Sequence, residues 1–275
     1  MKLITDSSSN LLTFPGVPFA VTPLKIITEQ KEYIDDHTLN VKEMVLDLAA
    51  YSGRSSTSCP NTADWLNAFG DAEDAICVTI TSGLSGSYAS AVAAQTTILQ
   101  KHPHRNLYVM DSRSTGPEME LHLEKAKELA GTGLPFPDIC QSLEAYKEQT
   151  ELLFVLNSMQ NLANNGRVSP IAAKMAGLLG IRAIGRASDA GELQLLNKVR
   201  GKQKSLQAVV TYMQKMGYAG GKVRIAHCLN DTEAETLRDA LQNLYGNISV
   251  EIRPCGGLCS FYAEKGGLLI GYEKA

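Results

Sequence analysis

Four clusters of polar side chains, rich in hydroxyls, stand where strands or loops are expected to end in this chain of 275 residues. They occupy residues 5–9, 55–60, 81–87 and 111–112. A single serine or threonine in such a place often does no more than cap a helix. Because ligands of parallel α/β sheets bind beyond the carboxyl ends of the strands, four converging clusters favour one shared ligand.

The third cluster has the features of an anion site. Its sequence context, "CVTITSGLSGSYASAVAAQ" at residues 77–95, runs from a β-branched strand pattern through a tight turn into a helical pattern. The first N–H groups of a helix lack partners within the helix, and the helix dipole is positive at that end. The turn at 82–86 therefore predicts binding of a negatively charged group.

The elements that position these clusters alternate along the first half of the chain. We expect strands at residues 2–5, 19–27, 75–80 and 107–110, and helices at 41–50, 63–69, 88–99 and 117–129. In the first of these helices Val41, Met44, Val45 and Leu48 share one apolar face. The alternation predicts an α/β fold with a mostly parallel sheet.

A break at residues 131–137, "GTGLPFP", precedes a second series of elements. Strands are expected at residues 152–156, 180–184, 193–199, 223–228, 248–252 and 268–272, with helices between them. The sequence therefore predicts two α/β domains, residues 1–149 with the hydroxyl-rich loops and residues 150–275.

Composition and charge exclude several classes of function. The formal net charge is -3, so the basic excess typical of nucleic-acid-binding proteins is missing. No apolar run reaches the roughly 18 residues of a membrane span, and no apolar leader follows Met1. Six scattered cysteines suit a reducing compartment, and the histidines show no metal-binding spacing. We expect a cytoplasmic protein without a metal site.

Five motifs resemble, in order, those of the DegV family. They are "ITDSSSNL" at residues 4–11, "STSCPN" at 56–61, "TSGLSGSYASA" at 81–91, "NLANNGRVS" at 161–169 and "NKVRGKQK" at 197–204. The resemblance implies two α/β domains that hold one long-chain fatty acid between them, with no cofactor. It also implies the role of the fatty-acid-binding subunit of a fatty acid kinase. Such a subunit presents the carboxylate to a separate kinase and carries the acyl phosphate.

The same resemblance implies a ligand-binding set that consists of Thr57, Ser82, Ser56, Ser58, Gly83 and Ser85. In this set the hydroxyls of Thr57 and Ser82 donate hydrogen bonds to the carboxylate. Neutral donors suit a buried carboxylate because an unpaired buried cation is costly to desolvate.

Two arginines match basic positions of the family. Arg200 is a candidate for contact with a phosphorylated head group or with the kinase, since a guanidinium fits phosphate geometry. Arg167 is assigned to the same group of contacts. For both residues a solvated or interdomain salt bridge is the alternative.

The chain departs from the family near its C-terminus. The family's His-x-Gly-Pro-Gly motif is absent, and "CGGLCSFYAEKGGLLIGY", residues 255–272, stands in its place. Tyr262 is nearest to the missing histidine, and we expect its phenol to be a neutral donor to the carboxylate. The alternative is that Tyr262 only packs. Cys255 and Cys259 are expected to be small core residues rather than a redox pair.

Other functions fit fewer residues. A serine-dependent lipid or ester hydrolase would use Ser82 or Ser85, but the nucleophile-elbow spacing is not met and no base is evident beyond His227. A nucleotide-binding domain would need a glycine fingerprint or a P-loop lysine, and neither follows a strand. Asp6 and Asp111 could hold magnesium, although we expect them to cap or orient neighbouring hydroxyls.

Overall fold

The structure is a computed structural model that describes residues 1–169 and 180–275. A four-stranded parallel sheet forms its N-terminal part, with strand order β2-β1-β6-β7. The strands are β1 (Lys2–Asp6), β2 (Phe19–Thr22), β6 (Asp74–Thr79) and β7 (Asn106–Asp111). The parallel N-terminal sheet predicted from the alternating pattern is confirmed.

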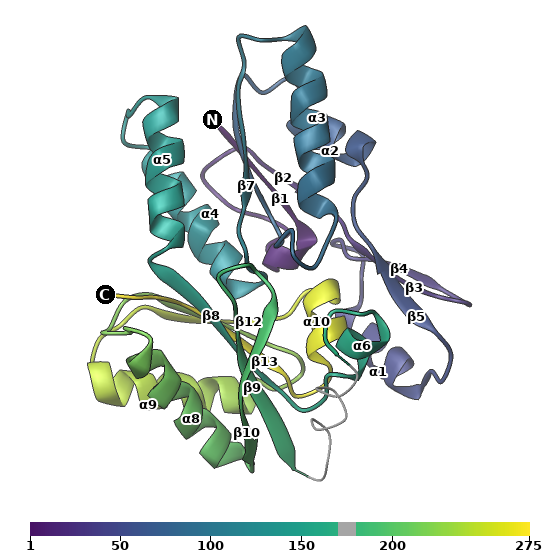
Figure 1. Ribbon diagram of the computed structural model, residues 1–275, viewed down its shortest axis with the longest axis vertical. Helices are drawn as coiled ribbons and strands as arrows, with labels where there is room; N and C mark the ends of the chain where they lie inside the picture. Colours follow the sequence, from purple (N-terminus) through teal and green to yellow (C-terminus); the bar gives the residue numbers. More distant parts are fainter. Residues whose placement is uncertain (170–179) are drawn as a thin grey trace.

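Helices cover both faces of this sheet because successive strand residues point to opposite sides. Ile4 and Cys77 pack against α2 (Thr62–Phe69) and α3 (Ser87–Lys101), whereas Leu3 and Ile76 pack against the other layer. That layer consists of α4 (Pro117–Ala130) and α5 (Phe136–Lys147). Figure 1 shows the two helix layers on either side of the upper sheet.

A second, six-stranded sheet lies below the first and has strand order β10-β9-β8-β13-β11-β12. Its strands are β8 (Thr150–Leu156), β9 (Ile181–Ala187), β10 (Leu193–Arg200), β11 (Val223–His227), β12 (Val250–Pro254) and β13 (Leu268–Glu273). One face is covered by α8 (Lys202–Lys215) and α9 (Asp231–Tyr245), which pack on residues such as Leu153 and Ile270. The opposite face carries Leu152, Phe154 and Leu156.

A third, antiparallel sheet joins β4 (Glu32–Ile34), β3 (Lys25–Thr28) and β5 (Ser55–Ser58). Helix α1 (Val41–Ala50) packs with it, and Met44 and Val45 of the predicted apolar face are buried. Two short helices, α6 (Gln160–Asn164) and α10 (Gly257–Ala263), stand between this sheet and the six-stranded one (Figure 1). A 3-10 turn, η1 (Ser7–Ser9), follows β1.

Three sequence-based expectations are wrong. The single strand expected at residues 19–27 is two strands in different sheets, because Pro23 has no N–H to donate to a continuing ladder. Residues 55–58 form strand β5 rather than a loop, and β4 was not predicted at all. No helix separates β9 from β10, which form an antiparallel hairpin.

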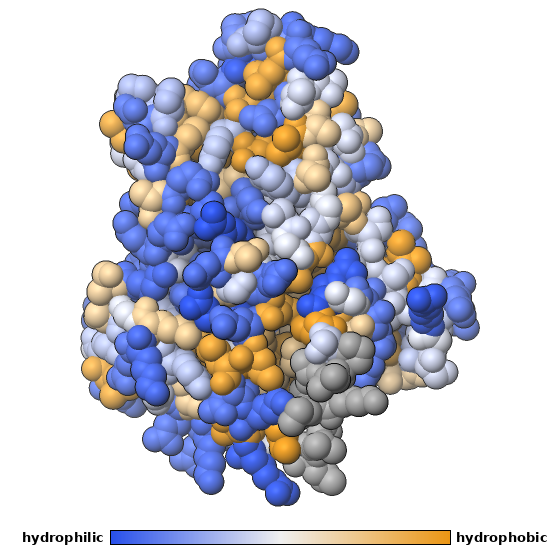
Figure 2. Space-filling view, in the orientation of Figure 1, coloured by the Kyte–Doolittle hydropathy of each residue, from blue (hydrophilic) through white to orange (hydrophobic). Residues whose placement is uncertain are grey.

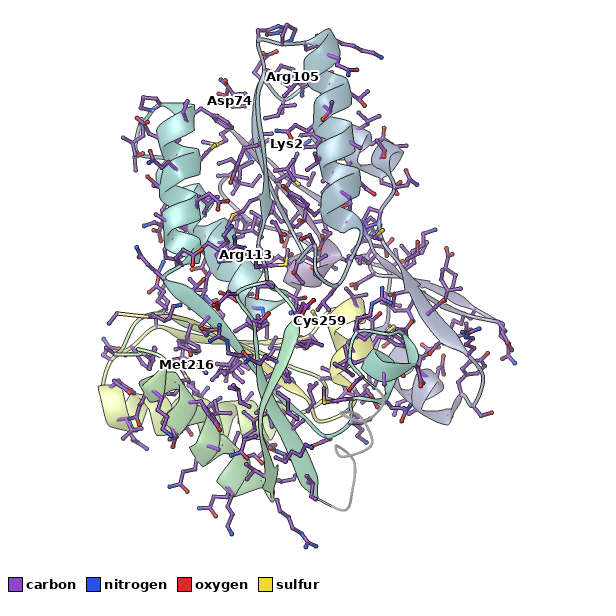
Figure 3. All side chains as sticks on the ribbon, viewed as in Figure 1. Lys2, Asp74, Arg105, Arg113, Met216 and Cys259 are labelled. Carbon is purple, nitrogen blue, oxygen red and sulfur yellow. The ribbon has the colours of Figure 1, made fainter. Side chains whose placement is uncertain are left out.

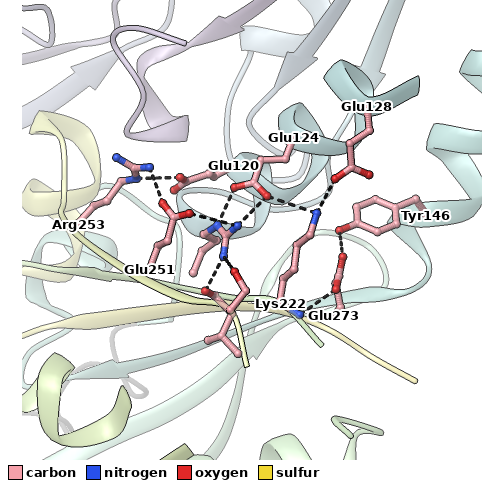
Figure 4. A network of polar contacts seen from close by, with 11 residues as sticks. Glu120, Glu124, Glu128, Tyr146, Lys222, Glu251, Arg253 and Glu273 are labelled. Atoms are coloured by element: carbon pink, nitrogen blue, oxygen red, sulfur yellow. Dashed lines mark hydrogen bonds and ion pairs between the residues drawn. The ribbon is translucent and has the colours of Figure 1, made fainter. Parts of the chain in front are cut away.

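An ion-pair network fastens α4 to the six-stranded sheet (Figure 4). Glu120, Glu124 and Glu128 are four residues apart and therefore lie on one face of α4. Glu120 pairs with Arg253 of β12 at 2.8 Å, and Glu124 pairs with Arg224 of β11 at 2.7 and 2.8 Å. Glu128 pairs with Lys222, the residue before β11, at 2.6 Å. These pairs hold the parallel sheet, through α4, in a defined position over the second sheet.

The cysteines form no disulfide bonds in this structure. All six cysteines are free thiols, and both Cys255 and Cys259 are buried in the core. Cys259 lies on α10 near the middle of the molecule (Figure 3). Across residues 1–169 and 180–275, no helix combines the length and the apolar character needed to cross a bilayer.

Candidate ligand-binding site

A largely apolar cavity of about 300 Å³ lies where the three sheets meet. Leu152, Phe154 and Leu156 of β8 form one wall, and Leu258 of α10 and Leu269 of β13 extend it. Figure 2 shows hydrophobic side chains in the hollow near the middle of this face. Polar side chains, with Thr57, Ser85 and Tyr262 among them, contribute a smaller part of the lining, so the cavity suits a ligand with a long apolar part and a polar end.

Thr57 and Tyr262 form one side of the polar end. The hydroxyl groups of the two residues lie 2.7 Å apart, although they are 205 positions apart in the chain. Burial raises the pKa of the Tyr262 phenol, so this side chain stays neutral at physiological pH. Two hydroxyls in contact share only one hydrogen bond, which leaves a second O–H available to donate to an acceptor in the cavity.

A buried carboxylate positions the helix that carries Tyr262. Asp35 accepts hydrogen bonds from the backbone N–H groups of Gly257, at 2.6 Å, and Leu258, at 2.9 Å, which begin α10. A Cβ atom at Gly257 would lie 2.7 Å from the Asp35 carboxylate, so only glycine allows this close approach. Gly257 of the C-terminal segment therefore serves to seat α10 beside the cavity.

The hydroxyl-rich turn before α3 also contributes to the polar end. Ser85 is half-buried and lines the cavity, and the backbone at Gly86 caps the start of α3. By contrast, Ser82 is exposed, and its backbone N–H donates to Asp111 at 3.1 Å. The turn therefore presents Ser85, rather than Ser82, to the cavity.

Asp6 and Asp111 organise this turn. The Asp6 carboxylate accepts hydrogen bonds from the Ser87 hydroxyl at 2.7 Å and from the Ile80 N–H at 3.0 Å, and burial raises its pKa. Asp111 accepts from the N–H groups of Ser82 and Arg113. Both acids thus orient neighbouring groups. Among the residues that the structure describes, no cluster of acidic, histidine or cysteine side chains could hold a metal ion.

Arg167 brings a positive charge to the polar end. Its guanidinium donates to the carbonyl oxygens of Leu84 and Asn165, and its charge lowers the pKa of Tyr262, against the larger effect of burial. Leu84, Arg167 and Leu193 also line a second, polar hollow that includes Gly83. Because these three residues border both spaces, the polar end of the cavity faces this hollow.

Of the other predicted residues, Ser58 also lines the cavity, at the end of β5, whereas Ser56 is exposed. Gly83 borders the polar hollow rather than the cavity, and Arg200 is exposed at the end of β10. Five of the proposed contacts, Thr57, Ser58, Ser85, Tyr262 and Arg167, therefore share the cavity, and four do not.

Sequence inspection missed two residues that matter at this site. Thr115 lines the cavity, and the hydroxyl run that continues past Ser112 was a usable signal for it. Asp35, which seats α10, stands beside the solvent-facing Asp36 in the sequence. Nothing in the local pattern distinguishes the buried aspartate from the partly exposed one.

The described residues that line the cavity include no histidine, aspartate, glutamate or lysine that could act as the base of a serine hydrolase. The Nδ1 atom of His227 accepts a hydrogen bond from the Asn230 N–H at 3.1 Å, at the end of β11. A Ser85 hydroxyl without a neighbouring base can donate hydrogen bonds but is not activated as a nucleophile.

Comparison with known proteins gives one consistent family. The model of the DegV family, described as an uncharacterised protein family, matches residues 1–275. A DegV domain-containing protein of Streptococcus pneumoniae is 40% identical over 276 residues, which cover 99% of this chain and 98% of that protein.

Two solved structures are similar over their whole length. A DegV family protein from Eubacterium eligens, loaded with heptadecanoic acid, has a TM-score of 0.97 and 40% identity and covers 100% of this chain and 99% of its own. The fatty acid kinase (Fak) B3 protein of Streptococcus pneumoniae, loaded with linoleic acid, has a TM-score of 0.97, 39% identity and the same coverage.

Proposed function

The chain belongs to the DegV family, and we propose that it binds one long-chain fatty acid and presents the carboxylate to a separate fatty acid kinase. The observation that carries this proposal is the cavity itself, with its long apolar wall and its polar end of Thr57, Ser85 and Tyr262. The fatty acids bound by the two similar solved structures support the same ligand class.

In this proposal the tail supplies most of the affinity. Burying about 15 methylene groups at ~0.8 kcal/mol each contributes roughly 12 kcal/mol before the costs of ordering and association. The hydroxyl donors contribute less and fix the direction of the ligand. Their neutrality lets the carboxylate be held without a buried, unpaired cation.

We further propose that residues 1–149 and 150–275 are two domains with the ligand between them. The polar end draws Thr57 and Ser85 from the first and Arg167 and Tyr262 from the second. A kinase in the cytoplasm reaches the carboxylate through the polar hollow beside Arg167, and the protein carries the resulting acyl phosphate. Arg167 suits the added phosphate because its guanidinium already borders both spaces.

Native mass spectrometry of the purified protein, followed by denaturing extraction, tests the binding step. We expect a near-stoichiometric fatty acid in the extract. Absence of lipid, together with no uptake of added palmitate, contradicts the proposal. For the kinase step, the loaded protein is mixed with a bacterial fatty acid kinase and ATP, and acyl phosphate is trapped with hydroxylamine as the hydroxamate.

A further inference from the structure

The cavity wall formed by β8 has a large aromatic residue at its centre. Because side chains alternate along a strand, Leu152, Phe154 and Leu156 all point toward the cavity, while Leu153 and Val155 point into the core beneath α8 and α9. Phe154 is 1% exposed and is the aromatic member of the three.

The ring of Phe154 lies over the neighbouring strand rather than standing free in the cavity. Gly185 of β9 is paired with Phe154 across the sheet. A Cβ atom at Gly185 would lie 2.2 Å from Cζ of the ring, closer than any side chain permits. Ala183, two residues away on the same face of β9, is also small. The ring therefore fills a hollow above β9 that would otherwise be open to the cavity.

Phe154 lies further along the cavity wall than the end of β8 that is nearest to the hydroxyl-rich turn. The hydroxyl of Thr81, at the start of the hydroxyl-rich turn, donates to the Gly191 carbonyl at 2.9 Å, in the β9 to β10 connection. The start of β8 lies at that same end of the sheet, because Leu153 pairs with Arg186 near the end of β9. Phe154 is two residues, or about 7 Å, further along β8 than Leu152.

We propose that Phe154 selects the shape of the acyl chain, because its ring closes the hollow over Gly185 and restricts the cavity to chains without a branch in their middle part. This inference rests on the proposed fatty-acid binding. The head-group donors then fix orientation, and chain shape is selected at β8. A mid-chain methyl group meets the ring, whereas a methyl group near the chain terminus does not.

The test compares three acids of similar size by displacement of a fluorescent fatty acid: octadecanoate, 10-methyloctadecanoate and 16-methylheptadecanoate. The wild-type protein should bind the mid-chain-branched acid on the order of tenfold more weakly than octadecanoate, since overfilling a packed site is unfavourable. Phe154→Ala should bring the affinity for 10-methyloctadecanoate close to that for octadecanoate. It should leave the affinity of 16-methylheptadecanoate relative to octadecanoate unchanged.

Leu269→Ala is the matched control. Leu269 of β13 pairs with Phe154 on the side away from β9 and also lines the cavity. Its truncation should therefore weaken the binding of all three acids without uncovering Gly185. Phe154→Leu is measured in parallel, with an expected intermediate ratio, so that a folding defect in the alanine variant does not decide the outcome.

Two results separate the inference from the proposed function. If the wild-type protein binds the acids but neither Phe154 variant changes the branched-to-unbranched ratio, or Leu269→Ala changes it equally, the inference is overturned and the fatty-acid binding stands. If the wild-type protein binds none of the three acids, both are overturned.

Discussion

Replacing Ser85 and Ser82 separately tests how the hydroxyl-rich turn holds a carboxylate. Ser85 is half-buried and lines the cavity, whereas Ser82 is exposed with its backbone bound to Asp111. Removing one donor from a buried carboxylate costs about 1–3 kcal/mol, or roughly a 5- to 150-fold rise in Kd. We therefore expect Ser85→Ala to weaken fatty-acid binding by that amount, and Ser82→Ala by less than about 0.5 kcal/mol.

The assay is displacement of a fluorescent fatty acid from delipidated protein, with thermal unfolding measured for each variant to show that it is folded. Thr57→Val should weaken fatty-acid binding by an amount similar to Ser85→Ala, because it removes one hydroxyl group and leaves the Tyr262 hydroxyl without its partner. Equal losses for Ser82→Ala and Ser85→Ala, or a loss for Ser82→Ala alone, would refute the assignment of the polar end.

Three further predictions concern the wider structure. Tyr262→Phe should weaken fatty-acid binding by about 0.5–1.5 kcal/mol, because it removes one hydrogen-bond donor. The affinity of the wild-type protein should stay flat between pH 6 and 8, because the buried phenol does not titrate there. If Tyr262→Phe leaves the affinity unchanged in the displacement assay, Tyr262 only packs. Glu124→Gln should lower the free energy of unfolding in urea by about 2 kcal/mol, since the nearly buried Arg224 loses a bidentate partner. Glu251→Gln is the control and should lower it less, because the exposed Glu251 carboxylate meets Arg224 through a single contact at 3.5 Å. Burial raises the pKa of Glu118 from 4.5 to about 7, so between these pH values the folded state binds more protons than the unfolded state. The free energy of unfolding should therefore fall by about 3 kcal/mol as pH rises from 4.5 to above 7. Glu118→Gln, measured by urea unfolding over the same pH range, should remove this contribution to the pH dependence.

The sequence by itself determined the order and type of most elements. Strand patterns of β-branched and apolar residues at β1, β6 and β7 alternate with helical patterns, and burial of both faces of the sheet follows from that alternation. The motifs also pointed to the family, and the resemblance to it implied Thr57, Ser58, Ser85 and Arg167, which line the cavity.

Tertiary structure alone decided which of these residues share a cavity. Strand β5, with the sequence SSTS, shows no strand pattern, because its stability comes from pairing with β3 rather than from its own side chains. The contact of Thr57 with Tyr262 depends on how α10 is seated by Asp35, a carboxylate that is distant in sequence from both. The orientation of Ser82 and Ser85 depends on Asp111 and on the start of α3, so local spacing could not distinguish the exposed hydroxyl from the one in the cavity.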